Sequence, residues 1–400
     1  MNILYVGYWP AADTLTQAVI LPRLQLLSEQ QEVEKIVFCS IERGSKTNLS
    51  KDVPKTKWIA FQSKNKGNVL LTKFSDFTEL PPFLIGIIQV EKIDLVIANS
   101  PLAGGACYLA LRKVKIKLVV ECFEPHAESM LESGVWRRWD LRYWILRYLE
   151  TKLKKYAWRL ITVSYHYTKK LASEGVSGCK IITMPNCLRI EDFRFQQDKR
   201  NEIRNSLAIS DNQIVGVYVG KFGGIYYDKE AYKLFASAFH FFGERFRLII
   251  LTGHTVSEVS DNLKKQNVDL TKVFISSVPH SQVANYLSAS DFAFATIKPT
   301  PTRLYCCPVK NGEYWANGLP VLLENGIGDD SDILKKEGGG VIFNHQMPNA
   351  GFNELQHRMG EGRRFLANKI HAIAEKHRSD KLMKEVYQKV FQDYSEKAFT

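Results

Sequence analysis

TRLYCCPVKNGEYWANGLPVLLENGIG, residues 302–328, combines the signals of a short helix and of a buried strand that follows it. Pro308 can open the helix, because its missing N–H is not needed in a first turn and its fixed φ suits a helix. Gly318 can end the helix, since glycine readily takes the left-handed conformation after a last turn. The apolar run Pro320–Leu323 indicates a buried strand. The stretch therefore predicts a helix–strand unit.

Three polar residues of the predicted helix point to a ligand. Lys310 and Glu313 are three residues apart, and Glu313 and Asn317 are four apart, so all three can lie on one side of the helix. A cation and a carboxylate beside a helix N-terminus suit a ligand that carries both a phosphate and a hydroxylated ring. The alternative is a surface helix whose Lys and Glu are only solvated.

The pattern PxKxxEYxxxGxPV, from Pro308 to Val321, resembles that of the retaining nucleotide-sugar glycosyltransferases of the GT-B architecture, group 1 or family four. The resemblance implies an α/β fold of two Rossmann-like, doubly wound domains that face a cleft. It also implies that Glu313 binds the ribose hydroxyls of the donor nucleotide. One position departs from the family: Tyr305 stands where members commonly carry a glutamate that faces the donor sugar. Either the sugar is handled differently, a neighbour substitutes, or catalysis is impaired.

Composition limits the class of protein. Four hundred residues with 45% hydrophobic content suffice for two globular domains with separate cores. No apolar run is long enough for a transmembrane helix, and the N-terminus MNILYVGYWP lacks the features of a signal peptide. We therefore expect a cytoplasmic protein. The formal charge of +12 suits a polyanionic partner, which could be a nucleoside diphosphate, nucleic acid or an anionic membrane.

The seven cysteines form no CxxC pair and are odd in number, which argues against a disulfide framework or a zinc ribbon. We expect free thiols, no bound metal ion and no cofactor, with the nucleotide sugar as a substrate.

The first part of the chain alternates apolar runs with amphipathic segments, as in a parallel sheet covered by helices. The predicted strands are Ile3–Val6, Ile36–Cys39, Leu95–Ala98, Leu118–Glu121, Leu160–Val163 and Ile181–Met184, and the predicted helices are Thr14–Glu29, Gly104–Arg112 and Tyr167–Glu174. We assign residues 1–190 to a first Rossmann-like domain, which the resemblance makes the acceptor domain.

His126 lies in a loop that directly follows the predicted strand Leu118–Glu121. The family often places a histidine in this loop near the reacting sugar, so the resemblance makes His126 a catalytic candidate. A histidine there can donate a hydrogen bond to a sugar hydroxyl or share a proton near neutral pH. Alternatively, it satisfies backbone groups of the loop. Glu121 and Glu124 can bind acceptor hydroxyls or have no catalytic part.

Aromatic and basic residues are interleaved from Trp136 to Arg159, which we predict to be helical. This span holds eight Lys or Arg, two acids and four of the seven tryptophans. Such a mixture suits the headgroup zone of an anionic membrane, where a lipid-linked acceptor would lie. The candidate docking residues are Trp136, Arg137, Arg138 and Trp139. Alternatively, the helix packs inward, as Leu141, Ile145, Tyr148 and Leu149 suggest by their spacing. No module signature for nucleic-acid binding accompanies these residues.

The second half repeats the alternation after a polar linker near residues 186–208. The predicted strands are Val215–Val219, Leu248–Thr252, Val273–Ser276 and Phe292–Ala295, and the predicted helices are Lys229–Phe241, Val256–Lys265 and Ser281–Ser288. We assign residues 206–375 to a donor domain. We expect a helix at 376–400 that, by the resemblance, crosses back to the first domain.

Two glycine-rich turns in the second half are candidates for the donor site. Gly220, Gly223 and Gly224 follow a strand and let backbone N–H groups approach an anion, with Lys221 or Lys229 as the cation. In the family, two basic residues near these positions face the donor diphosphate.

Further candidates lie at other predicted strand ends of this half. His254 follows a strand and can line the donor cleft, and Gly326 and Gly328 let the chain pass close to the phosphates. We interpret Asp330-Ser331-Asp332 as a helix cap that matches a metal motif by chance. The resemblance implies Lys, Arg and helix dipoles in place of a metal.

These features predict an enzyme that moves a sugar from a nucleoside-diphosphate sugar to a hydroxyl acceptor with retention, with Lys221, Lys310 and His126 as catalytic residues. The acceptor is expected to be a glycan or a lipid-linked molecule, at the inner face of a membrane. A nucleotide-sugar epimerase and a catalytically inactive nucleotide-sugar-binding or membrane scaffold are the alternatives.

Overall fold

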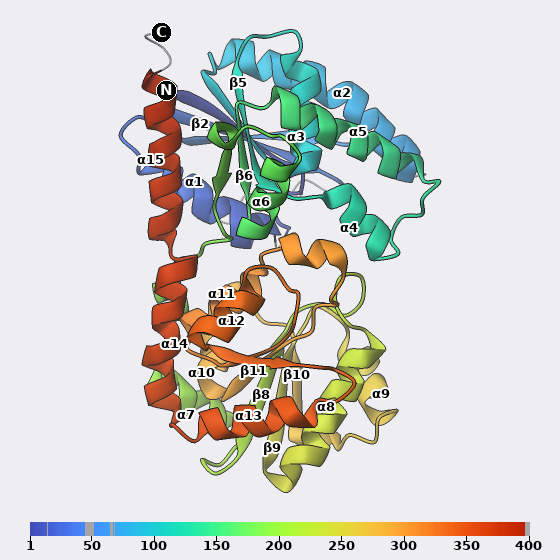
Figure 1. Ribbon diagram of the computed structural model, residues 1–400, viewed down its shortest axis with the longest axis vertical. Helices are drawn as coiled ribbons and strands as arrows, with labels where there is room; N and C mark the ends of the chain where they lie inside the picture. The colour runs from blue at the N-terminus through green and yellow to red at the C-terminus, as the bar shows by residue number, and fades with distance from the viewer. Residues whose placement is uncertain (14, 45–51, 65–66, 68, 397–400) are drawn as a thin grey trace. The chain divides into compact units, whose positions relative to one another are not determined.

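The computed structural model describes residues 1–13, 15–44, 52–64, 67 and 69–396 (Figure 1). The chain divides into two compact units. The first unit consists of Met1–Asn186 with Lys381–Thr400, and the second of Cys187–Asp380. Each unit is a parallel sheet covered by helices, and both follow the α/β pattern expected from the sequence.

The first unit contains, among its described residues, a seven-stranded parallel sheet with the order β3-β2-β1-β4-β5-β6-β7. Its strands are β1 (Asn2–Gly7), β2 (Lys35–Glu42), β3 (Thr56–Gln62), β4 (Leu95–Asn99), β5 (Lys117–Phe123), β6 (Arg159–Thr162) and β7 (Ile181–Thr183). The central strands are buried, because the crossover helices of a parallel sheet cover both faces.

The helices of the first unit are α1 (Leu21–Ser28), α2 (Val69–Val90), α3 (Pro101–Leu111), α4 (His126–Glu132), α5 (Leu141–Tyr156), α6 (Tyr165–Ser173) and the C-terminal α15 (Asp380–Glu396). Helix α3 packs against both α2 and α5 (Figure 1). Thr14, the predicted start of the first helix, lies outside the described residues; the helical segment begins at Thr16 with a π-turn that leads into α1.

Strand β3 and helix α2 have no counterpart among the predicted elements. β3 is an edge strand with a half-exposed sequence, TKWIAFQ, whose apolar run Trp58–Phe61 is only four residues long. Helix α2 contains Pro81 and Pro82, and an internal proline normally ends or kinks a helix. Local sequence therefore gives a weak strand signal in one case and a misleading break in the other.

The second unit contains, in the part of the chain described, a six-stranded parallel sheet with the order β10-β9-β8-β11-β12-β13. Its strands are β8 (Ile214–Val219), β9 (Phe246–Leu251), β10 (Val273–Ser276), β11 (Phe292–Ala295), β12 (Val321–Glu324) and β13 (Gly340–Phe343). The strand order reverses between β8 and β11. Ligands of doubly wound sheets bind at the carboxyl ends of the strands on either side of such a reversal.

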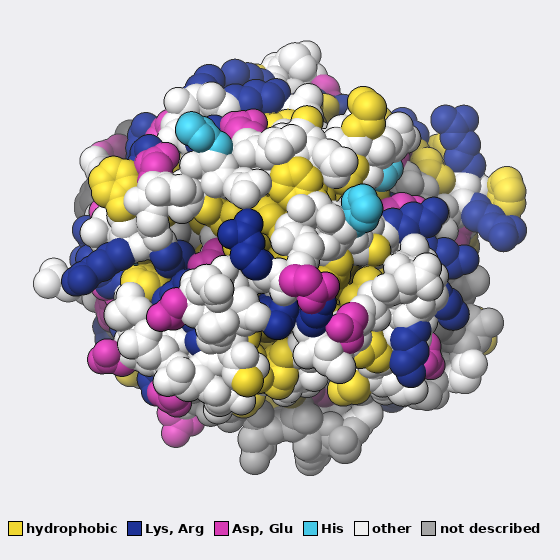
Figure 2. Space-filling model, turned by 90° about the horizontal axis from the view of Figure 1, so that it is seen from below, with side chains coloured by type: hydrophobic (Ala, Val, Ile, Leu, Met, Phe, Trp, Pro, Cys, Tyr) yellow, Lys and Arg dark blue, Asp and Glu magenta, His cyan; other side chains and the backbone are white. Residues whose placement is uncertain are grey.

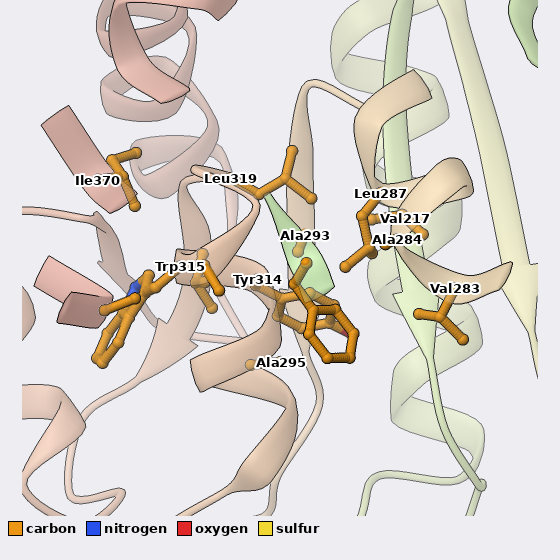
Figure 3. Packing of buried hydrophobic residues seen from close by; sticks show 14 of the residues in the cluster. Val217, Val283, Ala284, Leu287, Ala293, Ala295, Tyr314, Trp315, Leu319 and Ile370 are labelled. Atoms are coloured by element: carbon orange, nitrogen blue, oxygen red, sulfur yellow. The ribbon is translucent and has the colours of Figure 1, made fainter. Parts of the chain in front are cut away.

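Helices cover both faces of the second sheet. One face carries α7 (Gln197–Ser206), α10 (His280–Ala289), α11 (Val309–Ala316) and α14 (Arg363–Arg378), and the other carries α8 (Lys229–Phe242), α9 (Val256–Lys264) and α13 (Asn349–Met359). The unit also contains α12 (Asp330–Glu337) and the short helices η3 (Ile190–Phe193), η4 (Gly243–Arg245), η5 (Leu270–Lys272) and η6 (Pro301–Tyr305). Each face has its own apolar core; Figure 3 shows the core that α10, α11 and α14 form with the sheet.

The end of the second unit differs in detail from the prediction. The helix predicted at 376–400 corresponds to the last residues of α14 and to α15, with a break at Ser379, and residues beyond 396 lie outside the described part of the chain. Strand β13 begins at Gly340, the last of three consecutive glycines, and was not predicted, because only three apolar residues lie between that glycine and Asn344. No described helix has the length and apolar character needed to cross a membrane.

Candidate functional site

Helix α11 is fixed at both ends by its own sequence. Pro308 is the residue before the helix, with φ −64° and ψ 120°, so the helix begins one residue later than the proline signal predicts. Gly318 follows the helix with φ +71°, and a Cβ there would lie 2.3 Å from Cα of Ala367. No other residue fits this turn. Tyr314 and Trp315 extend from the buried side of α11 into the core (Figure 3).

Glu313 lies on α11 and forms a hydrogen bond that the sequence did not predict. Its Oε1 is 2.9 Å from Nε2 of His280, the first residue of α10. The side chain of Glu313 is 6% exposed and that of His280 is 42% exposed. This hydrogen bond raises the pKa of His280 above its ordinary value. Among the described residues no partner binds the second oxygen of Glu313, Oε2, so it is available to a ligand hydroxyl.

Lys310 lies beside the end of strand β8. A Cβ on Gly220 would meet Cε of Lys310 at 3.0 Å and the hydroxyl oxygen of Tyr218 at 3.1 Å. The Tyr314 hydroxyl accepts a hydrogen bond of 3.0 Å from the N–H of Val219, which ties α11 to the same strand end. No described carboxylate forms an ion pair with Lys310. An unneutralised cation therefore lies at the carboxyl edge of the sheet, where the strand order reverses.

The turn after β8 contains three of the predicted donor-site residues. Gly223 and Gly224 have φ of +80° and +64°, with open space where a Cβ would point. Lys221 is exposed in the same turn. Nε2 of His254 accepts a hydrogen bond of 3.3 Å from the N–H of Phe222. The structure thus brings His254 to this turn, and its contact is with the backbone.

Lys229 is the first residue of α8 and is exposed, as predicted. The structure brings Lys310 and Gly220 together, with Lys221 next in the chain.

The turn after β12 places Gly326 and Gly328 differently. Gly326 has φ +82° and open space beside it, whereas a Cβ on Gly328 would lie 2.1 Å from the carbonyl oxygen of Cys306. Gly326 can therefore approach a ligand, and Gly328 is required for close packing of the chain against itself.

The Asp330-Ser331-Asp332 segment begins α12. The predicted cap is wrong in detail: Asp329 is the N-cap residue without a side-chain cap, and the Ser331 hydroxyl bonds the turn before the helix. Asp330 is buried, ion-pairs with Arg378 and accepts a 2.8 Å hydrogen bond from Asn311. A carboxylate held in this way is part of the core.

His126 is the first residue of α4 in the first unit. Its Nδ1 lies 3.5 Å from the Glu124 carboxylate, and its ring packs edge-on against Trp136. The neighbouring N–H of Ala127 donates to Glu150, which is buried in α5. Burial raises the pKa of Glu150 to about 7. Glu150, whose carboxyl has this raised pKa, therefore lies at the N-terminus of the helix that begins with His126.

Glu121 has no exposed surface and is not available to an acceptor. Its two oxygens accept hydrogen bonds of 2.7 Å from the hydroxyl of Tyr5 and 2.6 Å from that of Tyr387, and Nε of Arg23 lies 3.5 Å away. Cys122, at φ +49°, interrupts the pairing of β5 with β6 next to Glu121. Glu121 therefore has a structural role and does not bind an acceptor: it links α15 to the first sheet.

The segment from Trp136 to Arg159 is not one helix. Residues 136–140 form a turn, Asp140 caps α5 by accepting from the N–H of Arg142, and Arg159 already belongs to β6. The inward packing suggested by spacing applies to Leu149 alone. Six exposed large hydrophobic residues lie on the first half of α5 or just before it: Val135, Trp139, Leu141, Trp144, Ile145 and Tyr148; we call them the α5 stripe.

Basic side chains surround the α5 stripe. Arg137 lies over the ring of Trp139, Arg147 over that of Trp144 and Lys152 over that of Tyr148. By contrast, Lys and Arg alternate with Asp and Glu over the face drawn in Figure 2, so the net charge is not gathered there. Apolar and cationic groups are thus combined along α5.

Comparisons with known proteins agree with this architecture. The model of Glycosyltransferase Family 4 matches residues 60–192. No curated protein matches the chain in sequence.

Solved structures of the same fold cover nearly the whole chain. Anabaena HepE in complex with UDP and glucose has a TM-score of 0.73 and 13% identity, over 98% of this chain and 99% of that one. Sucrose-phosphate synthase from Thermosynechococcus elongatus has a TM-score of 0.75 and 12% identity, over 98% and 99%. WaaG, a glycosyltransferase involved in lipopolysaccharide biosynthesis, has a TM-score of 0.66 and 13% identity, over 93% and 95%.

At these identities the likeness shows the GT-B fold. The fold and the matched segment together support a glycosyltransferase.

Proposed function

We propose that this protein transfers a sugar from a nucleoside-diphosphate sugar to a hydroxyl acceptor with retention at the anomeric carbon. One observation carries the proposal: buried Glu313 and unneutralised Lys310 lie on one helix, beside the strand end where a doubly wound sheet binds its ligand. HepE, which has this fold, was solved with UDP-glucose, so we take UDP-glucose as the first donor to test.

In the proposed reaction, the bond between the anomeric carbon and the diphosphate oxygen breaks, and its electron pair goes to the diphosphate. The acceptor oxygen bonds to the same carbon from the same face, and its proton goes to the departing phosphate oxygen. Negative charge grows on the phosphates, so fixed cations and amides beside them stabilise the transition state. Lys310 and Lys221 supply the positive charge, with Lys229 as a reserve.

The backbones of Gly223, Gly224 and Gly326 complete the proposed diphosphate site, and Gly328 shapes it by its packing. Because Lys side chains and amides neutralise the diphosphate in this proposal, the transfer step needs no metal ion. His126 is proposed to bind a hydroxyl of the transferred sugar or of the acceptor.

Glu313→Gln is expected to weaken binding of the donor by about 10- to 100-fold, because hydrogen bonds to a charged group contribute about 1.5–3 kcal/mol. Glutamine retains an acceptor for His280 and removes only the charge. The measurement is calorimetric titration with UDP-glucose and with UDP. The matched control is Asp332→Asn, which removes a carboxylate from the Asp-x-Asp segment and should leave affinity unchanged. Equal donor affinity of Glu313→Gln and wild type would remove Glu313 from the site.

Product analysis distinguishes the proposed function from its alternatives. Release of UDP that depends on a lipid or glycan acceptor supports a transferase. Donor consumption without any acceptor indicates the epimerase, and binding without turnover indicates the inactive scaffold. For donor screening, a bound nucleotide sugar raises the thermal midpoint because it binds only the folded state.

We further propose that the α5 stripe docks on an anionic membrane that presents a lipid-linked acceptor. Interfacial Trp and Tyr rings with cations beside them suit the headgroup region. Trp139 is 78% exposed. Exposure of this large apolar ring to water costs free energy, and burial of the ring at the membrane interface would remove that cost.

Replacing Trp139 and Trp144 together by serine is expected to lower binding to phosphatidylglycerol vesicles at least tenfold in a co-sedimentation assay. The control is Phe365→Ser, which removes an exposed aromatic side chain from α14 in the second unit. Wild-type binding should fall as salt rises, since the cations are screened. Binding that is equal for neutral and anionic vesicles, or unaffected by the double substitution, contradicts docking through the stripe.

A further inference from the structure

Three potential metal ligands converge in the second unit, in residues that the proposed reaction does not use. His371 and Glu375 lie on α14, and Glu191 lies on η3. The imidazole nitrogen and the two carboxylates offer one ligand atom each, and these atoms lie within 4.8 Å of one another. His371 and Glu375 are four residues apart, so they project from one side of the helix.

The ring of His371 is oriented by a hydrogen bond, as the rings of metal-binding histidines commonly are. Its ring is buried, and Nδ1 lies 2.6 Å from the carbonyl oxygen of Ala316. A carbonyl oxygen can only accept, so Nδ1 carries the hydrogen. In the neutral ring Nε2 is then an unprotonated lone pair. Metal-ligating histidines commonly donate their other N–H to a carbonyl or carboxylate in this way, which fixes the tautomer and the ring orientation.

The second nitrogen of His371 points into the cluster without a hydrogen-bond partner. Nε2 is buried and unpaired among the described residues. Its distance to Oε1 of Glu191 is 3.8 Å, too long for a hydrogen bond. A buried polar atom left without a partner costs free energy, and a cation placed between it and the carboxylates would remove that cost.

The spacing of the three ligand atoms is compatible with a tetrahedral ion after a small adjustment. Ligand distances of about 2.0–2.2 Å place neighbouring ligand atoms about 3.4 Å apart. The two glutamates are exposed and can rotate inward, whereas His371 is already fixed. Arg194 lies 3.2 Å from the Glu191 carboxylate and would share it with the ion or be displaced by it.

We propose that Glu191, His371 and Glu375 bind one divalent transition-metal ion, with Zn²⁺ as the expected ion. One imidazole nitrogen and two carboxylate oxygens with an open fourth position suit Zn²⁺, whereas Mg²⁺ and Ca²⁺ prefer oxygen ligands alone. The proposal departs from the expectation of a metal-free protein. It is independent of the proposed transfer reaction, which uses no metal.

The site would connect the first turn of the second unit with its last helix and hold α11 between them. His371 contacts α11 through the Ala316 carbonyl, and Phe193, on the same turn as Glu191, packs its ring against His280. The side chain of Asn317 donates to the Phe193 carbonyl at 2.8 Å. A bound ion is therefore expected to stabilise the second unit around the helix that carries Glu313.

Calorimetric titration of the full-length, chelator-treated protein with ZnCl₂ tests the proposal. We expect one ion per chain and a rise in the thermal midpoint, since an ion that binds only the folded state stabilises it. Glu375→Gln and Glu191→Gln, both at exposed positions, should each weaken binding at least tenfold and leave the metal-free thermal midpoint unchanged. Glu385→Gln, an exposed glutamate on α15 outside the cluster, is the matched control and should bind as wild type does.

Two further measurements separate this site from chance binding. Arg194→Ala should strengthen Zn²⁺ binding, because it frees the Glu191 carboxylate. The Co²⁺-loaded protein should show tetrahedral visible bands without thiolate charge transfer, as expected for N and O ligands. Binding that survives both glutamate substitutions, thiolate bands, or no Zn²⁺ binding by wild type would overturn the proposal.

Discussion

Replacing Lys310 by methionine is expected to lower turnover of the donor by about 100- to 1,000-fold. The loss of one preorganised charge or donor at the place where negative charge develops typically costs about 2.7–4 kcal/mol of transition-state stabilisation. Lys310 is placed for this effect, because its stem lies beside Gly220 at the strand end and no described carboxylate neutralises it. Methionine retains most of the aliphatic stem, so the helix should keep its packing.

The measurement is release of nucleoside diphosphate under saturating donor, with folding checked by thermal unfolding. Lys336→Met is the matched control, because Lys336 is an exposed lysine on α12. We expect its turnover to equal that of wild type. If Lys310→Met turns over as fast as the control, the diphosphate lies elsewhere and Lys310 has no part in the reaction.

Glu121→Ala is expected to lower the free energy of unfolding of the first unit by about 3–5 kcal/mol. Removing one member of a buried ion pair leaves the other charge without compensation, which costs about this much. Here the substitution leaves the Arg23 guanidinium without its counter-charge and the hydroxyls of Tyr5 and Tyr387 without their acceptor. All three side chains are buried. Because Tyr387 belongs to α15, the same change should loosen the C-terminal helix.

Urea unfolding followed by tryptophan fluorescence measures this effect, since six of the seven tryptophans precede residue 187. Glu124→Ala is the control: Glu124 is three residues away and partly exposed, and among the described residues it pairs only with His126, at 3.5 Å. Its cost should stay below about 1 kcal/mol. Equal unfolding midpoints for the two variants would mean that Glu121 is not part of a buried network.

The helix–strand unit around Pro308 and Gly318 shows why part of the fold could be predicted. Proline and glycine act through their own backbone restrictions, so their effect does not depend on distant residues. The helix is bounded by them within one residue, and strand β12 follows as expected. Strand β3 and helix α2 were missed for the opposite reason: β3 is a half-exposed edge strand with an apolar run of only four residues, and α2 tolerates Pro81 and Pro82 because tertiary packing outweighs local propensity.

The candidate site, like the fold, could be predicted from the sequence only in part. The spacing of Lys310 and Glu313 placed both residues on one helix, and the glycine turn after β8 was recognised from its composition. His280 was missed as the partner of Glu313, because 33 residues separate them and only the folding of α10 against α11 joins them. Likewise, the H-x-x-x-E spacing at 371–375 gives a weak signal until Glu191, 180 residues earlier, completes the cluster.

Sequence by itself determined the α/β class and the repeated strand–helix alternation, because these depend on periodicity and on single-residue backbone preferences. Only the tertiary structure decided which charges are neutralised. It buried Glu121 and Asp330 in ion pairs, gave Lys310 no ion-pair partner among the described residues and turned the α5 stripe outward. The physical reason is that burial and charge compensation are set by neighbours distant in the chain, which no local pattern specifies.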